Sequence, residues 1–196
     1  MKTALAIIVL ASLIPLPLLA QKEEVDSQLR LLTHLQLANT NGQGVAGWLV
    51  IPDLTVPEPS LLAVGGWLIK EERGWKEFMA GGLFGADGSI KPALNLRSYS
   101  KSKKIDLYYE LMWRPDKAIA SSYATYPVGK FRLGVETELT AGLQPEVKSS
   151  ANIGPRFSLK IPKADWLTIS TSAMFDAKGE AIVRTYLTMN FSKTKP

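Results

Sequence analysis

The chain contains no cysteine and a single histidine, His34. Without thiols it forms no disulfide, offers no thiolate metal ligand or nucleophile, and carries no lipid on an N-terminal cysteine. A single histidine without clustered partners predicts no metal site, and the glycine-rich stretches do not precede a helix as a phosphate loop would. We therefore expect no metal, no cofactor and no enzymatic activity.

Long hydrophobic runs are confined to the N-terminus. Met1 and Lys2 precede an apolar stretch over residues 4–19, and Ala20 closes a plausible cleavage site. This layout is typical of a secretory signal peptide and predicts one over residues 1–20. Pro15 and Pro17 leave too short an unbroken run to span ~30 Å of hydrocarbon as a helix. We expect the mature chain to be exported.

A concentrated charge of either sign is also lacking. The formal net charge is +5, and it falls to +4 when Lys2 leaves with the signal peptide. A nucleic-acid binder gathers its basic residues into a patch, whereas here they alternate with acidic residues along the chain. The sequence predicts no nucleic-acid partner, although a mild attraction to anionic lipid headgroups is compatible with it.

From residue 45 onward, the chain divides into segments of about ten residues, and in many of them apolar and polar residues alternate with the period of a β-strand. The segments with strand character are 45–51, 61–70, 75–84, 90–99, 103–114, 118–126, 130–139, 147–161, 167–175 and 181–191. Connections rich in Gly, Pro and Asp separate them, which indicates hairpins and antiparallel neighbours. We predict an all-β, antiparallel up-and-down barrel of about ten strands over 45–191, with eight or twelve as alternatives, and a tail over 192–196.

Three local features carry separate predictions. Pro155 removes a ladder donor, so we expect a bulge or an edge-like irregularity there. The pairs Gly65-Gly66 and Gly81-Gly82 predict close packing in a curved sheet. Residues 21–44 have both helical and alternating leucine spacing; we predict a helix or irregular segment, with a further strand as the alternative.

Alternation alone does not tell which face of the barrel is apolar. A soluble barrel points its apolar face inward, and a membrane barrel points it outward. Segment length favours the membrane, because ~9–11 tilted residues cross a bilayer. Aromatic residues near the segment ends would form interfacial belts: Trp75, Tyr99, Trp113, Tyr126, Phe131, Trp166, Phe175 and Phe191.

The pattern over 45–191 resembles the bacterial outer-membrane β-barrel superfamily in its alternation, even strand count and short turns. RTYLTMNF at 184–191 is similar to the terminal strand by which that family is recognised, although five residues follow Phe191 here. The resemblance implies location in the cell outer membrane, with a periplasmic or secreted protein as the alternative. It implies outer-membrane lipid and the barrel-assembly machinery as partners. It also implies both barrel ends in the periplasm, with the turns at 52, 85, 114, 140 and 176 facing outward.

A membrane barrel of this kind would hold its charges in the lumen, where opposite signs neutralise one another. The polar residues expected there are Lys104, Asp106, Glu110, Arg114, Arg132, Glu136, Arg156 and Arg184. We interpret these carboxylates as members of a charge network and not as a hydrolytic pair. The expected role is structural or that of a narrow pore. Alternatives are a soluble exported barrel that binds an apolar ligand inside, and an outer-membrane lipid-modifying enzyme that uses His34.

Overall fold

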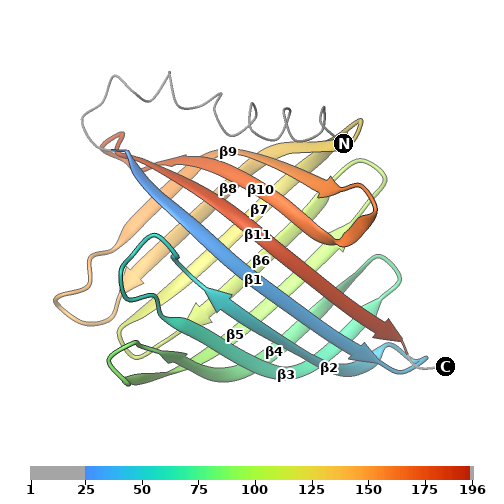
Figure 1. Cartoon of the computed structure of the whole chain (residues 1–196), viewed down its shortest axis with the longest axis horizontal. Coiled ribbons are helices and arrows are strands. Elements are labelled where there is room, and N and C mark those ends of the chain that lie inside the picture. The colour runs from blue at the N-terminus through green and yellow to red at the C-terminus, as the bar shows by residue number, and fades with distance from the viewer. Residues whose placement is uncertain (1–24, 195–196) are drawn as a thin grey trace.

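Each strand of the barrel is joined to the next by a short connection, and the last strand closes the sheet against the first (Figure 1). The computed structural model describes residues 25–194. Its strands are β1 (Asp26–Ala38), β2 (Gln43–Ile51), β3 (Leu61–Glu71), β4 (Gly74–Phe84), β5 (Ile90–Lys101), β6 (Asp106–Trp113), β7 (Lys117–Val128), β8 (Phe131–Gly142), β9 (Ser150–Ile161), β10 (Ala164–Phe175) and β11 (Ala181–Thr194). The predicted all-β barrel is confirmed, and each alternating segment overlaps a strand of it.

The strand count of about ten was wrong, because the closed sheet has 11 strands. With an odd number of up-and-down strands, the first and last run in the same direction. The β1–β11 pair is accordingly parallel, from Asp26 beside Ile182 to Ala38 beside Thr194. All other pairs are antiparallel.

The parallel closure also overturns the expectation that both barrel ends lie on one side. β1 begins at the end that carries the connections 52–60, 85–89, 114–116, 143–149 and 176–180, here named the loop end. β11 finishes at the opposite end with the connections 39–42, 72–73, 102–105, 129–130 and 162–163, here named the turn end. In Figure 1, β1 and β11 run side by side from upper left to lower right.

The prediction of a helix or irregular segment over 21–44 was wrong for the described part. Asp26–Ala38 forms β1 and Gln43 opens β2. The leucines of β1 fit helix and strand spacing alike, so local preference did not decide. Pairing with β11 on one side and β2 on the other closes the barrel through this segment, so long-range partners decide for the strand. The expected tail also starts later, since β11 continues to Thr194.

The apolar faces of the strands point out of the barrel. Val45, Leu139 and Ile153 are 58%, 55% and 58% exposed. The alternate positions on the same strands, such as Ala46, Glu138 and Asn152, are buried. Because successive side chains of a strand point to opposite faces, this alternation places a largely apolar surface outside and polar groups inside.

Aromatic residues lie near the strand ends on this outer surface. Trp113 and Phe175 are exposed near the loop end, and Tyr126, Trp166 and Phe191 are exposed near the turn end. Trp75 and Tyr99 were expected in the same belts and instead line the interior, where their rings stack 5.9 Å apart.

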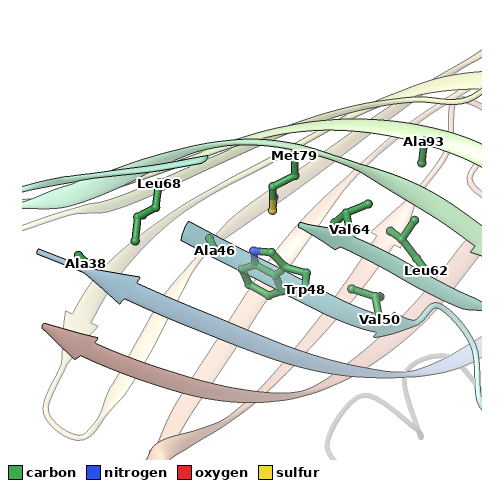
Figure 2. Close-up of a cluster of buried hydrophobic side chains, with 9 residues drawn as sticks. All are labelled: Ala38, Ala46, Trp48, Val50, Leu62, Val64, Leu68, Met79 and Ala93. Carbon is green, nitrogen blue, oxygen red and sulfur yellow. The ribbon is translucent and has the colours of Figure 1, made fainter. Parts of the chain in front are cut away.

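One part of the interior is apolar. The buried side chains that β1 to β5 point inward form a cluster (Figure 2): Ala38, Ala46, Trp48, Val50, Leu62, Val64, Leu68, Met79 and Ala93. Close backbone approach occurs beside it. A Cβ on Gly66 would lie 2.1 Å from the Phe78 carbonyl oxygen, and one on Gly81 would lie 2.0 Å from that of Ala63. The predicted close packing is confirmed for these two glycines, one from each pair.

The bulge predicted at Pro155 was wrong. β9 keeps one register with β10 across it, with Arg156 opposite Ser172 and Ile153 opposite Phe175. The register shifts instead between Ala164 and Thr168, beside the tight β9–β10 turn. A strand can carry an exposed proline when its partners hold the register on both sides.

The predicted signal peptide, residues 1–20, lies outside the described residues. Among residues 25–194, no helix is long and apolar enough to cross a membrane.

Candidate functional site in the barrel lumen

The predicted lumen residues occupy two kinds of position. Those buried in the interior are Asp106, Arg114, Glu136, Arg156 and Arg184, and those partly buried there are Glu110 and Arg132. Lys104 was placed with them by extending its segment to residue 103, but β6 starts only at Asp106. Lys104 therefore lies exposed in the 102–105 turn and takes no part in the lumen.

Ion pairs organise these charges, some between neighbouring strands and others between strands that are not adjacent in the sheet. Arg184 makes two hydrogen bonds of 2.9 Å to the Glu138 carboxylate, and Arg97 donates to Glu110 at 2.7 Å. The other pairs are Arg156–Glu136, Arg132–Asp106 and Arg114–Asp116. Such pairs offset the desolvation cost of a buried charge only when each member has its partner.

Aromatic rings and guanidinium groups follow one another around the lumen in what we call the cation–aromatic belt. Its members, in order around the wall, are His34, Trp48, Arg97, Tyr108, Tyr123, Arg156, Tyr186 and Arg30. Contacts over a ring face stabilise a buried guanidinium electrostatically. The belt therefore binds the apolar and the charged parts of the wall together.

Arg97 and Arg156 hold the belt together on its two sides. The Arg97 guanidinium lies 4.1 Å over the Trp48 ring, and Arg156 lies 4.3 Å over Tyr123 and 4.7 Å over Tyr186. Each of these arginines also pairs with a carboxylate, so each is held by a charge and by at least one ring.

Glu77 is the one carboxylate set into the apolar part of the wall, and its residue is 0% exposed. Its Oε1 accepts hydrogen bonds from His34 Nε2 at 2.6 Å and Gln36 Nε2 at 2.7 Å. Its Oε2 accepts one from Trp48 Nε1 at 2.7 Å. His34 also stacks on Trp48 with ring centroids 3.9 Å apart. Glu77 thus ties β4 to β1 and β2 across the interior.

Sequence reasoning missed this group because His34 was assigned to a segment before the barrel. The alternation of Leu35 and Leu37 with His34 and Gln36 was the signal that could have placed it. Arg97 was missed for a similar reason. In segment 90–99, Arg97 shares a face with the buried Ala93 and Asn95. Leu94 and Leu96 lie on the opposite face.

Two cavities lie inside the barrel, on either side of the belt. The loop-end cavity measures about 330 Å³ and the turn-end cavity about 390 Å³. Trp48, Tyr108, Tyr123 and Arg156 line both of them. The belt therefore lies where the two cavities adjoin.

Asp116 sits at the loop end, in the connection before β7. Burial raises the pKa of its carboxyl. The positive charges of Arg114 and Lys91 lower it by a larger amount, so the pKa lies below its ordinary value. Lys91 Nζ donates a hydrogen bond to the Asp116 carboxylate at 3.4 Å, and Arg114 Nη2 donates another to it at 3.2 Å. The carboxylate therefore fixes two basic side chains at the rim.

No group of three His, Asp or Glu residues within residues 25–194 is arranged to hold a metal ion. The chain matches no protein-family model, and a comparison with curated proteins gives no significant match. The interpretation of the lumen therefore depends on its own geometry.

Proposed function

We propose that this protein is an outer-membrane β-barrel of structural or narrow-pore type, with a charge-networked lumen and no catalytic activity. The observation that carries the proposal is the distribution of side chains between the two faces of the sheet. Most mid-strand positions that point outward are apolar, and many are exposed, while arginine–carboxylate pairs lie inside. Membrane barrels have this arrangement because lipid surrounds them and polar groups must be satisfied within.

Side chains that extend into the lumen support a structural or narrow-pore role over bulk diffusion. Small barrels fill much of their interior with side chains, and here the cation–aromatic belt crosses between the two cavities. We expect little ion conductance from the wild-type barrel in a planar bilayer. Trp48→Ala removes a ring that lines both cavities, so we expect it to raise the conductance.

The outer face provides the decisive experiment. Val135 lies near the middle of β8, points outward and is 47% exposed. In a membrane barrel, Val135→Arg should lower the free energy of unfolding by roughly 2–4 kcal/mol, as for arginine near a bilayer midplane. In a water-soluble barrel, a surface substitution of this kind changes stability by only about 0.5 kcal/mol.

The measurement is unfolding of the protein in lipid vesicles, followed by the mobility difference between unheated and boiled samples on gels. Lys104→Leu is the matched control, since Lys104 is exposed in a turn beyond the strands. A large effect at Val135 with none at Lys104 supports the proposal. Equal small effects, together with recovery of the protein in aqueous extracts without detergent, would reject it.

The two alternative functions have less support. A soluble barrel with an apolar ligand inside needs the apolar strand faces to converge on the cavity, but those of β8 and β9 point outward. A lipid-modifying enzyme that uses His34 needs lipid to reach it, but His34 is 4% exposed and is engaged by Glu77 inside the barrel. Unchanged lipid composition in cells that express His34→Ala would remove the second alternative.

A further inference from the structure

Side chains of two opposite characters line the loop-end cavity, and β1 and β7 contribute to both sets. We call each set a wall of the cavity. The apolar wall consists of Leu32, Val50, Pro52, Leu62, Leu83, Met112 and Ile119. Val50 and Leu62 belong to the cluster in Figure 2, where they lie side by side with Val64. At about 330 Å³, the cavity is at the lower end of the range for sites that hold small molecules, which combine apolar lining with a few placed polar groups.

The other wall is cationic. Its positive side chains are Arg30, Arg97, Arg114, Lys117, Arg156 and Arg184, and its carboxylates are Glu110, Glu136 and Glu138. Each of these carboxylates is already paired with an arginine of the same wall. Arg114 is paired with Asp116 at the rim. The charge left without a close counterion belongs to Arg30 and Lys117.

Arg30 and Lys117 have no short contact with a carboxylate, although Arg30 Nη2 donates to Gln28 Oε1 at 3.1 Å and its guanidinium lies 5.6 Å from the Tyr186 ring centre. The nearest carboxylate oxygen to Arg30 is that of Glu138 at 3.8 Å, and Glu138 already receives two hydrogen bonds from Arg184. Among the described residues, the Lys117 ammonium makes no ion pair or side-chain hydrogen bond.

Unused hydrogen-bond donors occur on the same wall. Arg97 is 2% exposed, yet its Nη1 has no hydrogen-bond partner within the described part of the chain. Arg30 Nε is buried without a partner as well. Buried donors that lack an acceptor are costly, and both of these belong to side chains that line the loop-end cavity.

We propose that the loop-end cavity binds a small amphipathic carboxylate, such as a medium-chain fatty acid anion. Its carboxylate lies at Arg30 and Lys117, and its alkyl chain lies against the apolar wall of Leu62, Met112 and Ile119. A positive wall alone would suit any anion, and an apolar wall alone any alkyl chain. The two together select a ligand with one charged end and one apolar end. The cavity lies inside the barrel whether lipid or water surrounds it. The proposed binding site therefore does not depend on the proposed membrane location, and each can be tested without the other.

The test is calorimetric titration of the folded, detergent-solubilised protein with octanoate, octanol, octylammonium and inorganic phosphate. We expect saturable octanoate binding at one site, and weaker or no binding of the other three. Lys117→Gln should weaken octanoate binding roughly tenfold or more, because a charge-assisted contact is lost. The matched control is Lys130→Gln, which removes the same charge from the wall of the turn-end cavity and should leave binding unchanged.

A second variant keeps every charge and changes only the space. Ile119→Trp should fill the cavity and abolish octanoate binding, with folding verified by heat-modifiable gel mobility. The proposal is overturned by equal affinity for octanoate and octylammonium, which would mean partition into detergent. Equal affinity for phosphate would mean a site for charge alone and would overturn it too. So would an octanoate affinity that responds to Lys130 and not to Lys117.

Discussion

Two parts of the lumen wall fill the same barrel by different means. The apolar wall, formed by β2, β3 and β4, presents Trp48, Val50, Leu62, Val64, Leu68 and Met79 around the single carboxylate of Glu77. The charged wall, formed by β8 to β11, presents Glu136, Glu138, Asn152, Arg156, Ser158, Ser170, Ser172, Arg184 and Tyr186. Their outer faces do not differ in this way: Trp67 of β3 and Leu133 of β8 are both exposed.

This contrast separates what the two faces of the sheet require. The outer face is largely apolar on both parts of the wall, as expected if both parts face the same environment. The inner face needs only to be filled and satisfied, which hydrophobic packing and paired charges both achieve. The two solutions should respond differently to mutation. Truncation of the apolar wall leaves a void, whereas truncation of the charged wall leaves a buried charge without its partner.

The largest effect is expected from the charged wall. Arg156→Met removes the partner of Glu136 and the cation between the rings of Tyr123 and Tyr186. We expect a loss of about 3–5 kcal/mol in the free energy of unfolding, because a buried carboxylate remains uncompensated. Urea unfolding in lipid vesicles, followed by gel mobility, measures it.

The double variant Arg156→Met with Glu136→Leu distinguishes a lost pair from lost packing. Removing both charges should restore much of the stability, since an apolar pair of similar volume often replaces a buried ion pair without loss. If the double variant is as unstable as the sum of the single variants, the charged wall is not organised by this pair.

The next effect is expected from the apolar wall. Leu68 is 0% exposed near the turn end. Leu68→Ala should cost about 2–5 kcal/mol through lost burial and the cavity left behind. Leu68→Met nearly conserves volume and should cost less than about 1.5 kcal/mol. Similar losses for both substitutions would show that this position is not tightly packed.

The two walls were not equally readable from sequence. The segments of the charged wall alternate strictly, so their faces followed from period two, and the inward places of Glu136, Arg156 and Arg184 could be derived. β3 and β4 carry apolar or glycine residues on both faces. For such strands alternation gives no signal, and the burial of Glu77 depended on side chains from other strands.

The prediction of strand number was wrong because it depends on a contact between residues far apart in the sequence. Whether 26–38 becomes a helix or a strand depends on β11, its neighbour in the sheet more than 150 residues away. Local spacing does not contain that pairing. The position of His34, the parallel closure and the placement of the chain ends at opposite ends of the barrel all follow from it.

A smaller effect tests the one carboxylate of the apolar wall. Glu77→Gln keeps the shape but replaces one acceptor oxygen with an amide donor. If this amide faces Trp48 Nε1 or His34 Nε2, one hydrogen bond is lost. We expect a cost of about 1–3 kcal/mol. The indole N–H resonance of Trp48 in an NMR spectrum should shift if Glu77 is its acceptor, while that of the exposed Trp166 should stay in place.

The smallest effect is expected for an ion pair that is exposed to solvent. Lys76 donates to Glu71 at the turn end, and about half of each side chain is exposed. Water screens both charges there, so Glu71→Gln should cost no more than about 1 kcal/mol. It should also become undetectable at high salt, whereas the cost of Arg156→Met should persist because that pair is buried. Comparable salt dependence at the two positions would mean that water reaches the charged wall freely. Its stability would then have to come from packing of the belt rings and not from the pairing of buried charges.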